Sequence, residues 1–251
     1  MNAINIAASG LRAQQNRLDT IGSNISNVNS IGYKATRADF KDALYSAIEN
    51  PDGPVLEANL IGGNGVITAS TTTDYTQGAI EDTDQMLDLA IVGEGFFVVQ
   101  NPNGEIRYTR NGSFGLSSEG AQAFLVTGSG QYVLDDAGNR IAIPVGENIS
   151  IGYGGIIRNE NSDVIGNIAV VGFTNPVGLD AMGDTSFAQT EVSGAPMNIA
   201  NADIRQGAVE KSNVDLSQEL TLMMRTQRAY SLASQALRTA DEMDGLANNM
   251  R

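Results

Sequence analysis

The sequence predicts a discontinuous α+β fold. In this fold the N- and C-terminal helices pair as a coiled-coil-like module, and a mainly antiparallel β domain is inserted between them. Apolar residues recur three and four positions apart at both ends of the chain, which is the spacing of a stripe along one side of a helix. The residues between the ends show short β-like runs separated by turn formers, and these runs lack the helical rhythm.

The first helix is expected over Ile4–Val28. Its apolar stripe is narrow, which suits a partner helix better than a broad globular core. The turn formers of Asn27–Gly32 end the pattern, and Gly32 can adopt a positive φ. The residues of this helix that we predict to form a self-assembly seam are Ile4, Leu11, Leu18, Ile21 and Ile25.

Two features precede the β domain. A second amphipathic helix is expected over Thr36–Ile48, because Phe40, Ala43 and Leu44 would share a face with Ala47 and Ile48. The composition then shifts to Pro, Gly and Asn over Glu49–Gly65, which indicates a surface connection.

Strand signals follow at short intervals. Pro102, Asn103 and Gly104 separate the first two and suit a hairpin turn, because Asn and Gly adopt left-handed conformations at low cost. The expected strands are Phe96–Gln100, Glu105–Thr109, Ala123–Thr127, Gln131–Leu134, Ile149–Ile151 and Val164–Phe173.

The last helix is expected over Asp215–Met250. Asp215 can cap its first turn, with Gln218 three residues later as in a capping box. Its predicted seam residues are Leu216, Leu220, Met223, Tyr230, Leu237 and Met243. The predicted organisation is a terminal helical assembly module (1–34 and 213–251), a connecting segment (35–75) and a central β-rich domain (76–212).

Composition excludes several function classes. The chain has 251 residues, a formal net charge of -14 and only scattered basic residues, so nucleic-acid binding is not expected. It contains neither Cys nor His, which removes zinc–thiolate sites, thiol nucleophiles and the commonest general base. No apolar run approaches the ~20 residues of a membrane span, and the start of the chain lacks the pattern of a cleaved signal peptide. We therefore expect no direct membrane insertion, no cofactor and no enzymatic activity.

Isolated motifs admit other interpretations. Gly93-Glu94-Gly95 superficially resembles a phosphate loop, but a strand rather than a helix is expected after it. Asp82, Asp84 and Asp88 lack the glycine and the final glutamate of an EF-hand loop. A carboxylate pair could in principle support glycoside hydrolysis, although no spacing selects one. The alternatives from other classes are a secreted β-rich surface-binding protein and, more remotely, a carboxylate-based hydrolase.

Three separated motifs resemble the flagellar rod and hook protein family, and they occur in the family's order from end to end of the chain. The N-terminal motif contains Asn24, Asn27, Gly32, Tyr33 and Lys34; Ser26 and Ser30 stand where Ala and Thr are common. The middle motif runs from Asp88 to Phe97 and from Tyr108 to Phe114. The C-terminal motif runs from Gly207 through Glu210 to Ser212, Asn213 and Val214, and it continues with Gln227, Arg228, Ala229 and Tyr230 and with Asp241–Met243.

The resemblance implies a structural subunit of the flagellar basal body that polymerises into a helical tube and transmits torque to the hook. The partners that it implies are other copies of the chain, adjacent rod and hook proteins, and the flagellar type III export apparatus. It implies an extracytoplasmic location reached without a cleaved signal peptide. The segments most similar to distal rod members are Gln227–Tyr230, Ser193–Pro196 and Phe40–Tyr45, with proximal rod and then hook members as the alternatives.

Overall fold

A computed structural model of the chain describes residues 2–43, 46–47, 61–62, 65–120, 122–144, 149–159, 161–199 and 201–249. The chain divides into two compact units. The helical unit comprises Met1–Ser26, Thr36–Thr73 and Asp215–Arg251, and the β unit comprises Asn27–Ala35 and Asp74–Val214. The predicted connecting segment, 35–75, falls mostly in the helical unit.

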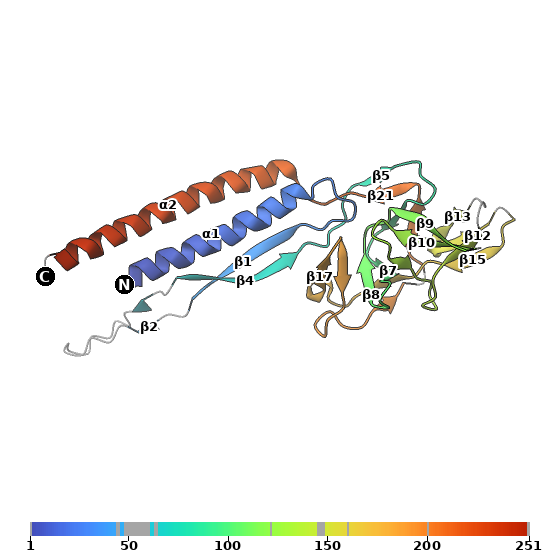
Figure 1. Ribbon diagram of the computed structural model, residues 1–251, viewed down its shortest axis with the longest axis horizontal. Coiled ribbons are helices and arrows are strands. Elements are labelled where there is room, and N and C mark those ends of the chain that lie inside the picture. The colour runs from blue at the N-terminus through green and yellow to red at the C-terminus, as the bar shows by residue number, and fades with distance from the viewer. Residues whose placement is uncertain are drawn as a thin grey trace. The chain divides into compact units, whose positions relative to one another are not determined.

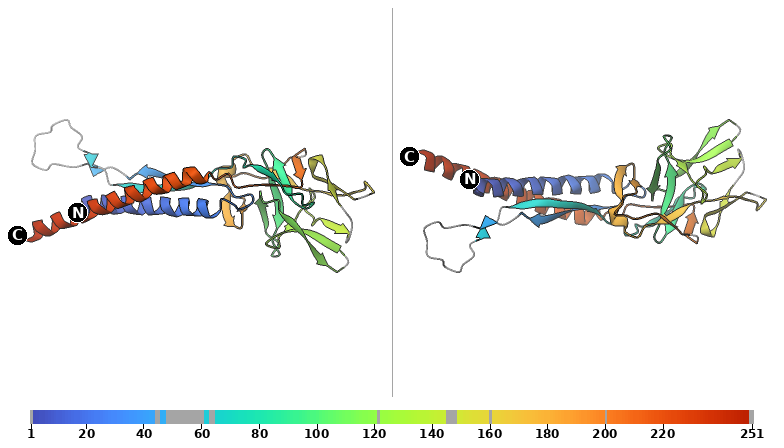
Figure 2. Two further views of the ribbon diagram at one scale, coloured as in Figure 1. Left: turned by 90° about the horizontal axis from the view of Figure 1, so that it is seen from above. Right: turned by 90° about the horizontal axis from the view of Figure 1, so that it is seen from below.

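The helical unit is built on α1 (Asn2–Ser26) and α2 (Leu216–Asn249), which lie side by side and run in opposite directions (Figures 1 and 2). A ribbon of β1 (Thr36–Asp42) and β4 (Val66–Thr73) packs along α1. Further along this ribbon, β2 (Ser46–Ala47) pairs with β3 (Ile61–Gly62). Both expected terminal helices are present. Neither has the length and apolar character that crossing a membrane requires, within the residues that the structure describes.

The helix predicted over Thr36–Ile48 is wrong. Residues 36–42 form strand β1, which pairs antiparallel with β4, while Leu44 and Ile48 of that prediction lie outside the described residues. Pairing with a threonine-rich strand supplies backbone hydrogen bonds that override the weak helical pattern. The surface connection predicted over Glu49–Gly65 also lies largely outside the described residues.

The β unit is antiparallel in every pairing between its described strands. Its main sheet has the order β12-β10-β11-β7-β8-β18-β17, with β9 beside β10, β16 beside β7 and β19 beside β16. A smaller sheet contains β13, β14 and β15. Two further sheets are strand pairs, one of β20 with β6 and one of β21 with β5. The inserted antiparallel β domain is thus confirmed.

The strands of the β unit have the following bounds: β5 Ile80–Asp82, β6 Leu89–Val92, β7 Phe96–Gln100, β8 Ile106–Thr109, β9 Phe114–Glu119, β10 Gln122–Thr127, β11 Tyr132–Val133, β12 Ala142–Pro144, β13 Ser150–Ile151, β14 Ile156–Arg158, β15 Val164–Asn167, β16 Val170–Gly172, β17 Asp180–Gly183, β18 Ser186–Ala188, β19 Met197–Asn198, β20 Asp203–Gln206 and β21 Ala208–Glu210. Short 3-10 helices lie at Tyr153–Gly155 and Pro176–Gly178.

Strand β7 organises two apolar cores. Phe97 and Val99 belong to one buried cluster, and Phe96 and Val98 belong to the other. Because successive side chains of a strand point to opposite faces, both faces of β7 are covered. This explains why the sequence shows a continuous apolar run here instead of alternation.

Most predicted strands lie close to observed ones, and the turn after β7 is confirmed. Gly104 N donates to Asn101 O at 2.9 Å, and Gly104 has a φ of +89°. The single strand predicted over Val164–Phe173 is instead two strands in different sheets, β15 paired with β14 and β16 paired with β7. The chain changes sheets between them, at Ile168 and Ala169.

Candidate assembly interface

Helix α1 is covered on more than one side, because both α2 and the β1–β4 ribbon pack against it. Ala13 and Ile21 are each only 4% exposed. The other predicted seam residues of α1, namely Ile4, Leu11, Leu18 and Ile25, are half-buried. The ribbon is also held by polar contacts, since Asn16 Nδ2 donates to Thr68 Oγ1 at 3.0 Å.

Helix α2 has one face with reduced exposure. Thr226 is 3% exposed at the centre of this face. The half-buried members recur three and four positions apart, as expected for one side of a helix: Glu219, Leu222, Met223, Ala229, Ala233, Leu237 and Ala240. Because α1 is the element that packs on α2, this stripe is the intramolecular contact face.

The predicted seam residues of α2 divide between two faces. Met223 and Leu237 lie in the intramolecular stripe, as does the signature residue Ala229. Leu216, Leu220 and Tyr230 are 42%, 44% and 38% exposed, and Met243 is 71% exposed. These exposed residues are therefore free to contact another molecule.

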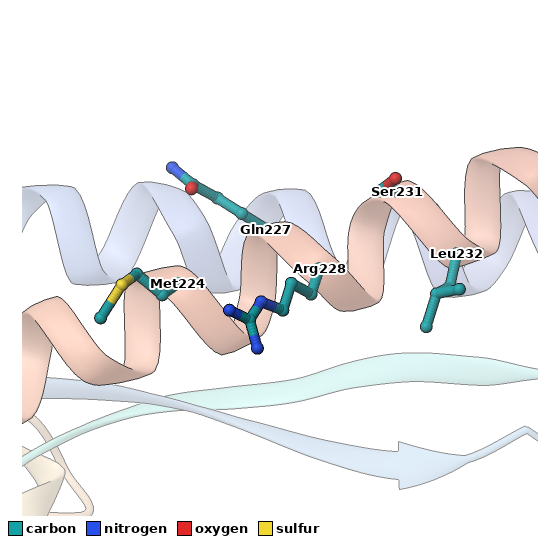
Figure 3. A pocket seen from close by; sticks show the side chains of 5 residues that line it. All are labelled: Met224, Gln227, Arg228, Ser231 and Leu232. Carbon is teal, nitrogen blue, oxygen red and sulfur yellow. The ribbon is translucent and has the colours of Figure 1, made fainter.

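The exposed face of α2 carries its own apolar stripe. Leu216, Leu220 and Met224 follow one another at intervals of four residues, and Met224 is 54% exposed. A shallow groove of about 460 Å³ begins at Met224 and continues along α2. It is lined by Met224, Gln227, Arg228, Ser231 and Leu232 (Figure 3). Gln227 and Arg228 are signature residues, so the C-terminal motif lies partly on this outer surface. We call Leu216, Leu220, Met224 and Leu232 the outer stripe.

Helix α2 is also longer than its partner. It has 34 residues and α1 has 25, which correspond to roughly 51 and 37 Å at ~1.5 Å per residue. In Figures 1 and 2, α2 continues past the start of α1. Near the end of α2, Met243 and Leu246 are 71% and 65% exposed.

The start of α2 is capped as predicted by Asp215. Its Oδ1 accepts hydrogen bonds from Ser217 N at 2.9 Å and from Gln218 N at 3.1 Å. These bonds satisfy amides that have no partner within the helix.

In the β unit, the signature residue Lys34 belongs to a buried ion cluster. Its Nζ lies 2.6 Å from Glu210 Oε1 and donates to Thr76 O at 2.7 Å. Glu210 Oε2 accepts from Arg110 Nη1 at 3.0 Å, and Arg110 Nη2 donates to Gly93 O at 2.8 Å. Lys34, Glu210 and Arg110 are 2%, 1% and 4% exposed, so two buried cations share a single buried carboxylate.

Burial is the main influence on the titration of these cations. It lowers the pKa of Lys34, an effect that the hydrogen bond and charge of Glu210 oppose. Burial likewise lowers the pKa of Arg110, again opposed by Glu210. The cause in both cases is that the charged form loses hydration that one shared carboxylate replaces only in part.

Gly32 is fixed by its surroundings as well as by its backbone. It has a φ of +68°, and a Cβ at this position would lie 2.4 Å from Asn111 N and 2.5 Å from Arg110 C. Its N–H donates to Glu210 O at 2.8 Å. The predicted turn at Gly32 is confirmed, and only glycine fits without displacing backbone.

Asn213, from the C-terminal motif, forms a second hub in the β unit. Its Oδ1 accepts from Ala35 N at 2.7 Å, and its Nδ2 donates to Asp74 O at 2.9 Å and Thr76 O at 3.1 Å. The neighbouring residues Ser212 and Val214 are linked by Val214 N donating to Ser212 Oγ at 3.3 Å. Of the remaining signature residues, Asn27 and Tyr33 are half-buried, and Asn27 Oδ1 accepts from Ser30 Oγ at 3.1 Å.

The prediction from sequence did not select Arg110 and Glu210 as site residues, although both lie in the family motifs. A usable signal was present, because Glu210 directly follows the apolar pair Ala208 and Val209. A carboxylate at the end of a buried strand needs a cationic partner. The sequence does not reveal which cation pairs with it.

Three family models match the chain. One described as "Flagella basal body rod protein" matches residues 4–34, one described as "Flagellar hook protein FlgE/F/G D1 domain" matches residues 90–159, and one described as "Flagellar basal body rod FlgEFG protein C-terminal" matches residues 205–250.

Individual proteins are similar over the full length. The flagellar basal-body rod protein FlgG of Borreliella burgdorferi is 37% identical over 269 residues, covering 100% of this chain and 99% of its own. That of Caulobacter vibrioides is 35% identical over 268 residues, covering 100% of both chains. The flagellar hook-basal body complex protein FlhP of Bacillus subtilis is 32% identical over 266 residues, covering 98% of this chain and 97% of its own.

Proposed function

The chain belongs to the flagellar basal-body rod protein family, and from this premise we propose that it is a structural subunit of the distal rod that self-assembles through its terminal helices. The full-length similarity to proteins named FlgG supports the distal position. The proposal assigns no catalytic step, cofactor or metal to the chain.

The observation that carries the proposal is the outer stripe of α2. Leu216, Leu220, Met224 and Leu232 leave much of their apolar surface open although one face of the same helix is already packed on α1. Burying a leucine or methionine contributes roughly 1.5–3 kcal/mol, so several such residues per subunit can offset the entropic cost of association.

The geometry of the contact determines what is built. A surface that binds a different surface of the next copy generates a ring or an open helical filament. In the contact that we propose, the outer stripe of one subunit binds a different part of the helical unit of the next subunit. Such a contact is head-to-tail. We propose that its repetition produces a helical tube that transmits torque to the hook.

Further partners and the cellular route belong to the same proposal. Adjacent rod and hook proteins would contact the ends of the tube, and the flagellar type III export apparatus would deliver the chain. The signature residues and the predicted seam residues are proposed to serve assembly.

A pair of charge substitutions on α2 tests the proposal. Leu220→Glu places a carboxylate on the outer stripe, and Gln218→Glu places the same group on an exposed position two residues away. The full-length proteins would be concentrated and compared by sedimentation velocity and electron microscopy, with circular dichroism as the check on folding.

We expect the wild-type chain and Gln218→Glu to form elongated polymers, and Leu220→Glu to remain monomeric with unchanged helix content. A carboxylate buried without a partner costs several kcal/mol, which is enough to prevent a contact of this size. Polymers of normal appearance from Leu220→Glu would show that the outer stripe is not an assembly surface. A wild-type chain that stays monomeric at every concentration would contradict self-assembly itself.

A further inference from the structure

Three segments of the β unit continue directly into residues of the helical unit. Residues 27–35 are followed by Thr36, residues from Asp74 onward follow Thr73, and the β unit ends at Val214 before Asp215. Within the β unit we call residues 32–35, 74–79 and 210–213 the stem segments. They come from distant parts of the sequence but are joined to one another by hydrogen bonds.

Glu210 is the first cross-link among the stem segments. Its backbone O accepts from Gly32 N at 2.8 Å, and its side-chain Oε1 accepts from Gly78 N at 2.9 Å. The same Oε1 lies 2.6 Å from Lys34 Nζ. One residue of the third segment therefore holds both of the others.

Asn213 is the second cross-link, and it uses different atoms of the same segments. Its side chain bonds Ala35 N, Asp74 O and Thr76 O. Asp74 N in turn donates to Ala35 O at 2.8 Å, which joins the first two segments directly.

Arg110 attaches the cross-linked segments to the core. It reaches Glu210 Oε2 with Nη1 and Gly93 O with Nη2, and its guanidinium lies 5.4 Å from the centroid of the Phe96 ring. Phe96 belongs to one of the two apolar cores. Detaching any stem segment would therefore leave a buried charge or a buried amide without its partner, which is costly.

We propose that Glu210 and Asn213 act as a clamp that makes the stem segments open and close as one cooperative unit. Strain that enters the β unit along any one segment is then shared by all three. All residues of the clamp belong to the β unit. The clamp can therefore be tested separately from the proposal that the chain builds a rod.

Amide hydrogen exchange of the full-length monomer, read residue by residue by NMR, tests the coupling. The informative variant is Asn213→Ala, because Asn213 bonds Ala35 N but neither Gly32 N nor Gly78 N. The matched control is Asn175→Ala, whose exposed side chain donates to Val192 O at 3.3 Å. Leu125 N, which donates to Ile141 O in the main sheet, serves as an internal reference.

For a cooperative clamp, Asn213→Ala accelerates exchange at Gly32 and Gly78 by a common factor, about tenfold or more if one opening governs both, and Ala35, which loses its own acceptor, accelerates at least as much. The exchange rate of Leu125 N stays at its wild-type value in Asn213→Ala. In the Asn175→Ala protein all of these amides exchange at wild-type rates. Acceleration confined to Ala35, with Gly32 and Gly78 unchanged, would overturn the proposal, because each bond would then be local.

A second variant approaches the clamp from the other residue. Glu210→Gln removes the shared carboxylate, and Glu105→Gln removes one from an ion pair with Arg107 in which the Glu105 side chain is 64% exposed. Glu210 makes none of the bonds described above to Ala35. We nevertheless expect Glu210→Gln to accelerate exchange at Ala35, because the clamp couples the two residues. Glu105→Gln should not change exchange at Ala35. Unchanged exchange at Ala35 in a folded Glu210→Gln protein would contradict the clamp. Should Glu210→Gln not fold, the result with Asn213→Ala decides.

Discussion

The side chain of Asn24 donates from Nδ2 to Glu219 Oε1 at 3.1 Å, which joins the last turns of α1 to the first turn of α2. The same amide pairs with both backbone groups of Thr36, accepting from N at 3.0 Å and donating to O at 2.8 Å. Asn24 is 2% exposed. A buried polar residue within an apolar helix pair fixes register, because any shift leaves it without partners. Asn24 therefore aligns α1, α2 and the start of β1.

We expect Asn24→Ala to lower the free energy of unfolding of the helical unit by about 1–3 kcal/mol, the cost of leaving buried polar groups unpaired. Asn16→Ala is the control, because Asn16 is exposed and makes its hydrogen bond to Thr68 at the surface. Urea unfolding followed by circular dichroism at 222 nm measures both. Equal losses in the two variants would show that burial of Asn24 adds nothing.

The seam on α1 leads to a second prediction. Leu18 is half-buried, whereas Gln15 is exposed on the same helix. Leu18→Asp should abolish polymerisation and leave the β unit folded, because the carboxylate loses hydration without gaining a partner. Gln15→Asp should polymerise. Sedimentation velocity reports polymerisation, and amide hydrogen exchange within β7 reports folding of the β unit. Normal polymers from Leu18→Asp would refute the seam assignment.

Gly32 and Gly104 separate the effect of steric crowding from that of backbone conformation. Both have positive φ, +68° and +89°, but a Cβ on Gly104 would meet no described atom within 4 Å. Gly104→Ala should therefore cost only the left-handed penalty, about 1–2 kcal/mol. Gly32→Ala should cost clearly more, because its Cβ would collide with the backbone of residues 110 and 111. Urea midpoints of the two proteins test this; a smaller loss for Gly32→Ala would mean that the turn can relax.

The lowered pKa of Lys34 predicts that the stability of the protein depends on pH. Its pKa in the folded protein lies below the ordinary value of 10.5, so between these two values the unfolded chain binds more protons than the folded protein. The contribution of Lys34 to stability therefore rises with pH through this window and is smallest below the folded pKa. We expect the stability of the wild type, relative to Lys34→Met, to increase as the pH approaches 10.5.

Parallel urea titrations of wild type and Lys34→Met at neutral and alkaline pH measure that difference. Lys34→Met should also be tolerated better than Glu210→Gln at neutral pH. The first leaves Glu210 paired with Arg110, while the second leaves two buried cations without a carboxylate. A relative stability that falls with pH would contradict the direction of the pKa shift.

The amino-acid sequence by itself determined the features that depend on neighbouring residues. The terminal helices, the Asp215 cap, the hairpin turn at Gly104 and the glycine at position 32 follow from local spacing and backbone preference. The absence of Cys and His likewise excludes thiol and imidazole chemistry on composition alone.

The tertiary structure alone decided which surfaces meet. On α2, apolar residues occur on more than one side, so periodicity could not distinguish the stripe through Thr226 from the outer stripe through Leu220. Residues 36–42 became a strand because β4 supplied a partner. Lys34 and Glu210 meet across 176 positions of sequence. Such pairings depend on the free energy of burial and hydrogen bonding between distant segments, which is gained only when the whole fold brings them together.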